Sequence, residues 1–551
     1  MESRSLLQKQ RLEFKPELPS ILENLKKGTF KPGSKQININ DQFRTIFPHL
    51  TGNPATLNLC SENEQNLLPK NVGVVFSGGP AAGGHNVITG LHDALMKLNP
   101  QSKLIGFCNG PKGIIDNVYV ELIKSSIEPY RNQGGFDMLG TGRTKIETSE
   151  QFQAAEKTAR LHKLDGLVIV GGDDSNTNAA LLAEYFKTQN CPTTVIGVPK
   201  TIDGDLKSEE VEISFGFDSA SKTYSEGIGN LQQDSISAKK YYFFIKIMGR
   251  SASHLALECA LKTHPNMTLI GEEIADKKLT LAELTAQISD MICKRADIGK
   301  DYGVILIPEG VIEFIPEFKQ LIKELNSLLS DKSHAEKYLA AASDKEKLDF
   351  AKGLLSQSSK NCLAALPEDI QLQLLLDRDP HGNVQVSKID TERLFIETVK
   401  RELKKRKNEG LYKGTFSPQP LFFGYEGRSC LPSNFDSQYC YALGYAAALL
   451  INSSATGYIC TIANLSKPVK EWKIGGCNLL ALMTLETRHG KEKPVIKKAL
   501  VELKAKPFKE FQLKRDSWMM EDHYQSPGPI QFFGPKDLTD SVPEILKLER
   551  S

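Results

Sequence analysis

The pattern of apolar residues along the chain changes near residue 71. Residues 1–70 mix helical spacing with proline and glycine breaks, which predicts an extension packed on the first domain or on a partner subunit. Beyond it, short apolar runs recur, each followed by a glycine-rich or turn-forming segment and then by helical spacing. The runs lie at 72–76, 104–107, 167–170, 194–198, 242–248, 268–270 and 304–307. Buried strands that alternate with helices predict doubly wound parallel sheets.

The chain has 551 residues, and because domains usually hold about 100–200 residues, this length predicts at least two cores. Residues 315–413 are rich in Lys, Glu, Leu and Ser, have helical patterning, and lack strand–glycine punctuation. We therefore predict a helical insertion there, with an ordinary turn at 379–383. The predicted segments are an extension at 1–70, a first α/β domain at 71–215, a second at 216–314 and 414–480, the insertion at 315–413, and a C-terminal segment at 481–551 packed on the α/β core.

Composition narrows the class of protein. The net charge is +2, which predicts neither a nucleic-acid surface nor a basic membrane-binding face. The ten cysteines are scattered without a CxxC pair, as expected of reduced thiols in a cytoplasmic protein. The N-terminus lacks the apolar stretch of a signal peptide, and the longest apolar stretch, at 441–451, is too short to span a bilayer. We expect a soluble cytoplasmic protein.

Glycine-rich and acidic segments follow three of the predicted strands, where ligands bind in open parallel sheets. The segment SGGPAAGGHN at 77–86 offers free N–H groups at a helix start, which attract phosphate, although a packing turn explains it equally well. GGDDS at 171–175 suits Mg²⁺, or Asp174 and Ser175 cap the following helix. PKTIDGD at 199–205 offers a carboxylate base and a lysine that neutralises phosphate, or an ordinary turn.

Two further segments place an arginine beside a glycine at the end of a predicted strand. They are MGR at 248–250 and YEGR at 425–428. A guanidinium in such a position suits bidentate phosphate binding, whereas a single arginine is usually a solvated surface group. Each segment alone is therefore weak support for a phosphate site.

The joint order of these segments is more informative than any one of them. GGP…GGHN, GGDDS, PKTIDGD, MGR, PEG at 308–310 and GYEGR occur in the order found in the phosphofructokinase family. From about residue 72 to 457 the chain resembles that family, and with its insertion it resembles the long pyrophosphate-dependent form. The resemblance implies an α/β fold with two Rossmann-like domains and the active site in the cleft between them. It also implies reversible, Mg²⁺-dependent phosphoryl transfer from pyrophosphate to the 1-hydroxyl of fructose 6-phosphate.

The resemblance also implies roles for individual residues. Asp203 matches the base, Asp173 the Mg²⁺ carboxylate, and Asp174 and Lys200 the pair that selects pyrophosphate. The first α/β domain would bind the donor phosphate through Gly78, Gly79 and Arg143. The residues matching the sugar-phosphate site are Thr201, Ile202, Met248, Gly249, Arg250, Glu309, Tyr425 and Arg428, mostly from the second domain. Lys240 and Tyr241 match positions that reach a neighbouring subunit, which implies a homodimer or higher oligomer.

Three alternatives are weaker. An ATP-dependent phosphofructokinase typically carries glycines where this chain has Asp174 and Lys200. A non-catalytic regulatory subunit is expected to have lost the base or the metal carboxylate, yet Asp203 and Asp173 are both present. A dinucleotide-binding protein is disfavoured because the glycine spacing is wrong.

Overall fold

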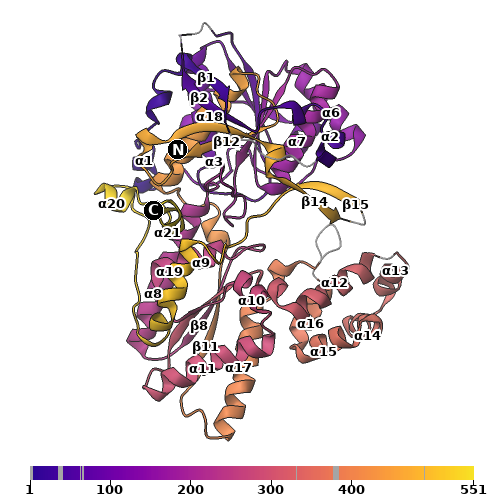
Figure 1. The fold of residues 1–551 in the computed structure, drawn as a ribbon, viewed down its shortest axis with the longest axis vertical. Helices are drawn as coiled ribbons and strands as arrows, with labels where there is room; N and C mark the ends of the chain where they lie inside the picture. The colour runs from indigo at the N-terminus through magenta and orange to yellow at the C-terminus, as the bar shows by residue number, and fades with distance from the viewer. Residues whose placement is uncertain are drawn as a thin grey trace. The chain divides into compact units, whose positions relative to one another are not determined.

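The computed structural model describes residues 4–34, 41–62, 64, 67–330, 332–376, 384–488 and 491–551 (Figure 1). The turn predicted at 379–383 lies outside these residues. The chain divides into two compact units. The first unit comprises Met1–Thr223, Tyr425–Ala499 and Ile530–Ser551, and the second comprises Tyr224–Gly424 and Leu500–Pro529.

A nine-stranded sheet forms the centre of the first unit, in the order β1-β2-β13-β12-β7-β6-β3-β4-β5 among the described residues. The five strands from β12 to β4 are parallel to one another. Each strand beyond them is antiparallel to the neighbour with which it pairs, both at the β13 side and at β5. Strands β6 and β7 are buried along their whole length, which explains why they read as continuous apolar runs. The strands are β1 (Gly28–Pro32), β2 (Thr56–Ser61), β3 (Asn71–Phe76), β4 (Lys103–Phe107), β5 (Tyr119–Glu121), β6 (Gly166–Gly171), β7 (Thr194–Pro199), β12 (Tyr458–Ala463) and β13 (Lys473–Asn478).

Two helices of this unit pack unusually closely on each other. They are α3 and α18, which also contacts β7 and β12. A Cβ added at Gly90 of α3 would lie 2.2 Å from the carbonyl oxygen of Tyr441, so the close approach requires glycine there. The apolar stretch noted in the sequence is thus the buried core of α18. The helices of the first unit include α2 (Asp41–Ile46), α3 (Gly84–Leu98), α4 (Pro111–Ile115), α5 (Lys124–Ile127), α6 (Ser149–Leu161), α7 (Asp173–Thr188), α18 (Asn434–Asn452), α20 (Lys536–Thr539) and α21 (Glu544–Arg550).

One predicted domain boundary needs correction. Residues 414–480 are predicted to belong to the second α/β domain, whereas in the structure residues 425–499 belong to the first unit. The reason is strand pairing, because β12 runs parallel to β7 and β13 pairs with β12. Only β11 (Pro418–Phe423) joins the sheet of the second unit.

The second unit contains a four-stranded sheet in the order β11-β8-β10-β9, whose paired strands are all parallel. Between β10 and β11 the chain forms the helices predicted for the insertion, of which α12 to α16 pack on one another, whereas α17 packs on α11 and against β8 and β11 (Figure 1). Strands β8 (Tyr242–Ile247), β9 (Met267–Thr268) and β10 (Gly303–Pro308) accompany α9 (His254–Thr263), α10 (Gly271–Lys277), α11 (Leu281–Asp297) and α19 (Lys506–Met520), while α8 (Phe217–Ala238) begins in the first unit. The inserted helices are α12 (Pro316–Ser330), α13 (Lys332–Ala340), α14 (Asp344–Leu354), α15 (Gln357–Ala365), α16 (Glu368–Leu376) and α17 (Thr391–Asn408).

The N-terminal extension packs on the first unit of its own chain. Helix α1 (Leu6–Arg11) ends in a fully buried arginine, whose guanidinium donates to Asn434 Oδ1 at 2.7 Å and Ser437 Oγ at 2.8 Å. Asn132 Nδ2 donates to the carbonyl oxygen of Arg11 at 2.9 Å. The two bonds from Arg11 attach the extension to the start of α18, and strands β1 and β2 of the extension join the central sheet of the same unit.

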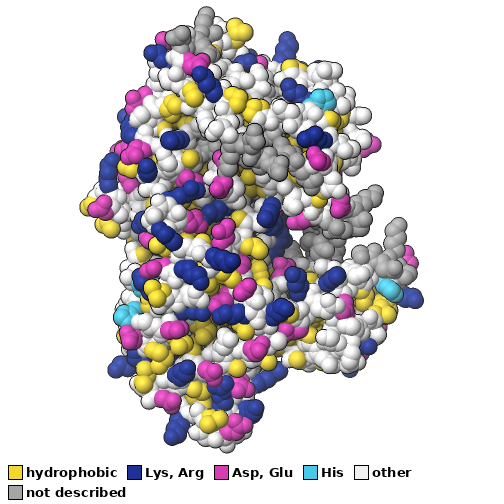
Figure 2. Space-filling view, viewed as in Figure 1, with side chains coloured by type: hydrophobic (Ala, Val, Ile, Leu, Met, Phe, Trp, Pro, Cys, Tyr) yellow, Lys and Arg dark blue, Asp and Glu magenta, His cyan; other side chains and the backbone are white. Residues whose placement is uncertain are grey.

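The surface carries charges of both signs. Lys and Arg side chains are interspersed with Asp and Glu over the face shown in Figure 2, in keeping with the small net charge. All ten cysteines lie in the described part of the chain, and all are free thiols. Within that part, no helix is both long and apolar enough to cross a bilayer.

Candidate active site

The loop after β3 is hydrogen-bonded to residues 141–142 of the first unit. Gly78 has φ +88°, a left-handed conformation that favours glycine. Its N–H donates to the carbonyl oxygen of Gly142 at 2.9 Å, and Thr141 Oγ1 donates to the carbonyl oxygen of Gly78 at 2.8 Å. Arg143 is therefore placed next to the glycine loop, as the phosphate-binding prediction requires.

A second guanidinium lies directly against this loop. A Cβ built on Gly79 would come within 2.3 Å of Arg428 Nη2, so a larger residue there would displace the guanidinium from this position. The guanidinium of Arg428 also lies over the ring of Tyr425, 5.3 Å from its centroid. Tyr425 itself is 70% exposed. The predicted sugar-phosphate role of this pair stays a prediction, and the structure places both residues in the first unit with the glycine loop.

Two carboxylates begin the helix that follows β6. Asp173 and Asp174 are the first residues of α7, where the helix dipole favours negative charge. The alternative that Asp174 or Ser175 caps this helix is wrong, because the N-cap is Gly172 and no side chain caps it. Ser175 Oγ instead donates to Ser77 Oγ at 2.7 Å. The carboxylates are therefore available for other contacts.

Each of these carboxylates lies next to a lysine that the sequence analysis missed. Asp174 is half-exposed, and its Oδ1 lies 3.1 Å from Lys145 Nζ. Asp173 Oδ2 lies 3.5 Å from Lys498 Nζ, which comes from the C-terminal part of the first unit. Neither lysine belongs to a motif, so spacing alone offered no signal for them.

Lys200 is the buried cation of the site. It directly follows β7 and is only 6% exposed, and a Cβ built on Gly78 would lie 3.3 Å from its Nζ. Together, burial as the largest cause and the charges of Arg428 and Arg143 lower the pKa of Lys200 to about 8, against the opposing charges of Asp203 and Asp173. These five groups therefore act on one another within a single charged site of the first unit.

The loop after Lys200 is organised by one threonine. Thr201 Oγ1 accepts a hydrogen bond from the backbone N–H of Asp203 at 3.1 Å and donates to Asp205 Oδ1 at 3.2 Å. Ile202 is buried beneath the loop, whereas Asp203 is half-buried. Burial, followed by the charges of Asp203 and Asp173, raises the pKa of Asp205 to about 7. Asp205 is a fourth carboxylate of the site, beside Asp173, Asp174 and Asp203, and it had no role among the residues predicted from the sequence.

The carboxylates fit a hard divalent cation that is shared with a ligand. No group of three or more His, Cys, Asp or Glu side chains able to hold a metal occurs in the described part of the chain. Mg²⁺, however, usually takes one or two carboxylates and completes its shell with water and substrate phosphates. Besides burial, which is the largest cause, the charges of Asp203 and Asp173 raise the pKa of Asp205, so these three carboxylates act on one another. A cation held by Asp173 and by phosphate oxygens suits this field.

The second unit assembles its own group of predicted residues at the carboxyl ends of β8 and β10. Gly249 follows β8 with φ +136°, and its N–H donates to Glu309 Oε2 at 3.2 Å. Glu309 directly follows β10 and is buried. Met248 donates its backbone N–H to the carbonyl oxygen of Phe423, while Arg250 is exposed. Adjacent parallel strands thus bring the predicted sugar-phosphate residues of this unit together.

Lys240 and Tyr241 lie at the opposite end of β8. Tyr241 has φ +76°, which is uncommon for a residue other than glycine and is often found at functional sites. Lys240 is exposed, and its Nζ lies 5.0 Å from the centroid of the Tyr241 ring. Strand β8 has six residues, and at about 3.3 Å per residue its ends are about 20 Å apart. One phosphate group therefore cannot contact both Tyr241 and Arg250 of the same chain.

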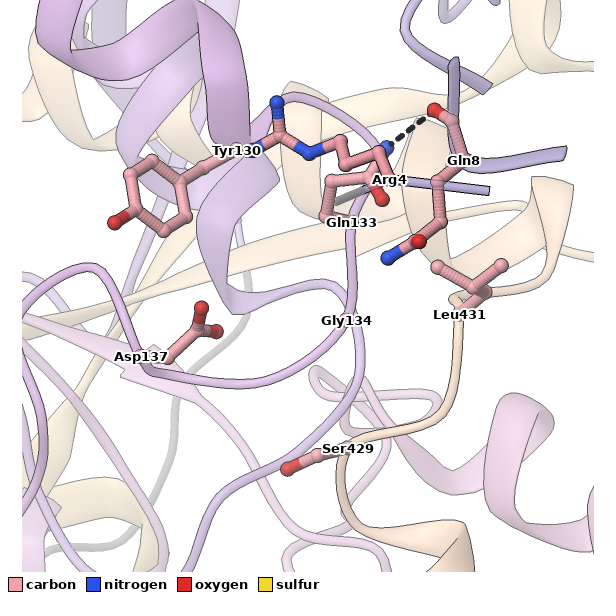
Figure 3. Close-up of a pocket in the computed structure, with 8 residues that line it drawn as sticks. All are labelled: Arg4, Gln8, Tyr130, Gln133, Gly134, Asp137, Ser429 and Leu431. Carbon is pink, nitrogen blue, oxygen red and sulfur yellow. Dashed lines mark hydrogen bonds between the residues drawn. The ribbon is translucent and has the colours of Figure 1, made fainter. Parts of the chain in front are cut away.

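A separate polar hollow of about 400 Å³ also lies in the first unit (Figure 3). None of the residues predicted for catalysis or substrate binding lines it. Its closest sequence link to the site is Ser429, which follows Arg428. The lining residues are Arg4, Gln8, Tyr130, Gln133, Gly134, Asp137, Ser429 and Leu431.

The chain is similar in sequence to known proteins over nearly its whole length. The sequence model of the family Phosphofructokinase matches residues 71–348. The pyrophosphate–fructose 6-phosphate 1-phosphotransferase subunit beta 1 of Arabidopsis thaliana is 53% identical over 550 residues, covering 99% of this chain and 94% of that protein. The pyrophosphate–fructose 6-phosphate 1-phosphotransferase of Entamoeba histolytica is 49% identical over 551 residues, which is the whole of both chains.

A solved structure supports the fold. The pyrophosphate-dependent phosphofructokinase from Nitrosospira multiformis matches with a TM-score of 0.53 at 15% identity, covering 88% of this chain and 97% of that one. At this identity the likeness concerns the fold alone. Together with the parallel strands at the centre of the first sheet and the parallel second sheet, it confirms the predicted α/β fold.

Proposed function

This chain belongs to the phosphofructokinase family, and from that premise we propose that it transfers a phosphoryl group from pyrophosphate to the 1-hydroxyl of fructose 6-phosphate. The products are fructose 1,6-bisphosphate and phosphate. The observation that carries the proposal is the buried Lys200 beside the Gly78 loop, with Asp174 at the start of the neighbouring helix. Relatives with this activity in their names match the chain over nearly its full length.

In this mechanism each residue of the first unit has a different role. Asp203 accepts the proton of the attacking hydroxyl, while Thr201 holds the backbone N–H of Asp203 and so orients the loop. Lys200 and N–H groups of the loop that follows Gly78 bind oxygens of the moving phosphoryl group, whereas the N–H of Gly78 itself donates to the carbonyl oxygen of Gly142. Mg²⁺, when bound by Asp173, would neutralise charge on the donor phosphates. Pyrophosphate and the sugar bisphosphate are not far apart in phosphoryl potential, so the transfer is reversible and serves glycolysis or gluconeogenesis.

An assay of the purified chain with fructose 6-phosphate and Mg²⁺ tests the proposal. We expect a much larger kcat/KM with pyrophosphate than with ATP as donor, because Asp174 and Lys200 replace glycines typical of ATP users. Preference for ATP would favour the ATP-dependent alternative. Absence of activity with either donor would favour a non-catalytic subunit, an assignment that the presence of Asp203, Asp173 and Lys200 makes unfavourable.

The group in the second unit accounts for binding of the sugar phosphate. Arg250→Ala should weaken the apparent affinity for fructose 6-phosphate by about 1.5–3 kcal/mol, because a charge-assisted hydrogen bond to phosphate is lost. Affinity for pyrophosphate should change little. Steady-state kinetics with each substrate varied in turn measures both. Exposed Arg401 of α17 offers a matched control, and Arg401→Ala should alter neither affinity.

We also propose that two subunits complete each site, with Lys240 and Tyr241 contacting the substrate bound to a neighbour. The length of β8 supports this assignment, since these residues are too far from Arg250 to serve the same phosphate in one chain. The left-handed conformation of Tyr241 is also typical of a functional position. The assembly would be a homodimer or a larger homo-oligomer.

Mixed oligomers test this shared site. An Asp203→Asn subunit and a Lys240→Ala subunit should each be poorly active alone, whereas each hybrid dimer regains one site with both groups intact. Random mixing should therefore restore about a quarter of the wild-type activity. Co-expression with two different affinity tags isolates the hybrids for assay. Hybrids without recovered activity would show that each site is built from one chain.

We also propose that the reaction takes place in the cytoplasm. The ten free thiols, half of which are buried, support a reducing compartment. The small net charge supports small-molecule substrates rather than nucleic acid or membrane as partners.

A further inference from the structure

A short C-terminal segment of the first unit runs along the candidate active site. It follows β15 (Lys491–Ile496), which pairs with β14 (Met483–Arg488). The N–H of Ile496 donates to Thr177 Oγ1 of α7 at 3.0 Å, and the N–H of Ala499 donates to the carbonyl oxygen of Asp205 at 2.7 Å. Between these two anchors, the side chain of Lys498 reaches Asp173 at the start of α7. The backbone on both sides therefore fixes where this lysine enters the site.

Lys498 acts electrostatically on the carboxylates. Its Nζ lies 3.5 Å from Asp173 Oδ2, and about a quarter of each side chain is exposed. Burial and the charges of Asp203 and Asp173 raise the pKa of Asp205, and the charge of Lys498 opposes that rise. The lysine thus offsets part of the negative charge of the site, although it comes from a segment outside the sequence motifs.

We propose that Lys498 is a further ligand of the donor phosphate and that it exchanges partners during binding. This inference rests on the proposed use of pyrophosphate. In the free protein the ammonium group pairs with Asp173. When Asp173 holds a divalent cation, like charges repel the ammonium group, and its flexible stem lets it turn to the phosphate oxygens that arrive with the metal.

A purely structural role for Lys498 predicts a different result. An ammonium group that only neutralises Asp173 competes with the cation, so its removal should tighten binding of both the free cation and the metal–pyrophosphate complex. A phosphate ligand also competes with the free cation, but its removal should weaken binding of pyrophosphate. The sign of the change in pyrophosphate affinity therefore separates the two roles.

The experiment compares the full-length wild type with Lys498→Met. Mn²⁺ binding without pyrophosphate is followed by electron paramagnetic resonance, and pyrophosphate binding at saturating Mg²⁺ is followed by calorimetry without sugar phosphate. We expect the affinity for Mn²⁺ to rise and the affinity for pyrophosphate to fall by about tenfold, since the lost contact is a partly exposed charge-assisted hydrogen bond. Lys498→Arg, which keeps the charge, should recover most of the pyrophosphate affinity.

Lys497→Met is the matched control, because the Lys497 side chain is exposed and its backbone N–H, which the substitution keeps, donates to the carbonyl oxygen of Leu482. It should leave both affinities unchanged. If Lys498→Met unfolds early in a thermal melt, Lys498→Gln replaces it in the same measurements. Unchanged or tighter pyrophosphate binding by the folded variant overturns the inference alone. Failure of the wild type to bind pyrophosphate overturns the proposed function, and the inference with it.

Discussion

Asp203→Asn should reduce turnover by about 10²–10⁴-fold, because an amide cannot accept the proton of the attacking hydroxyl. The substitution preserves shape, and the loop is held by the hydrogen bond from the Asp203 backbone N–H to Thr201 Oγ1, which asparagine keeps. Fructose 6-phosphate should therefore still bind with near wild-type affinity. The loss should appear in kcat rather than in KM.

Rapid-quench measurement of a single turnover would assign the loss to the chemical step. Asp165→Asn provides a matched control at the amino end of β6, where the Asp165 side chain accepts from the backbone N–H of Asn71. The same chemical change there should leave turnover within about threefold, because this edge of the sheet is away from the ligand-binding edge. Near wild-type turnover in Asp203→Asn would remove Asp203 as the base.

Asp174→Gly should shift donor preference toward ATP by about tenfold or more. By family resemblance the Asp174 carboxylate lies where the α-phosphate of ATP would be, so it opposes ATP by volume and by charge. Like charges about 4 Å apart repel by about 1 kcal/mol in bulk water and about 4 kcal/mol at an effective dielectric constant of about 20. Because Asp174 is half-exposed, the lower part of this range applies.

Lys200→Gly should instead greatly reduce turnover with pyrophosphate without producing good use of ATP. Pyrophosphate has no nucleoside to anchor it, so more of its stabilisation comes from groups at the phosphates, and Lys200 is the buried cation beside Gly78. Asp174 would still exclude ATP from this variant. The two substitutions therefore have different effects on the two donors.

Measurement of kcat/KM with each donor for the wild type and both variants decides the matter. Lys145→Met is a useful control, because it removes the lysine that pairs with Asp174 at 3.1 Å and leaves the carboxylate in place. It should preserve the preference for pyrophosphate over ATP. An Asp174→Gly variant with unchanged donor preference would show that another feature of the site excludes ATP.

The individual strands and the turns that follow them could be predicted from the sequence. The runs at 72–76 and 194–198 correspond to β3 and β7, and the glycine-rich or acidic segments after the strands lie at their carboxyl ends. This agreement has a simple cause: strand burial and turn chemistry are encoded within a few residues. The relative order of the motifs also indicated the phosphofructokinase family, and the comparisons confirm this family.

The sequence did not predict to which sheet each strand belongs. Strand β12 pairs with β7, about 260 residues earlier in the chain, and so brings residues after Gly424 into the first unit. A sequence pattern shows that a segment is a buried strand, but not which sheet edge it completes, because pairing depends on partners distant in the chain. The predicted boundary at 414–480 was wrong for this reason.

The candidate site likewise contains some features that the sequence determines locally and others that depend on the folded chain. The sequence by itself determined the groups within motifs, such as Asp173, Lys200 and Asp203, because their residue types and their positions after strands are local properties. Only the tertiary structure decided that Lys145 pairs with Asp174 and that Lys498 reaches Asp173. It also decided the pKa of about 7 for Asp205 and of about 8 for Lys200. Contacts and burial of this kind arise from segments far apart in the chain, and charges interact through the distances and the solvent exclusion that folding creates.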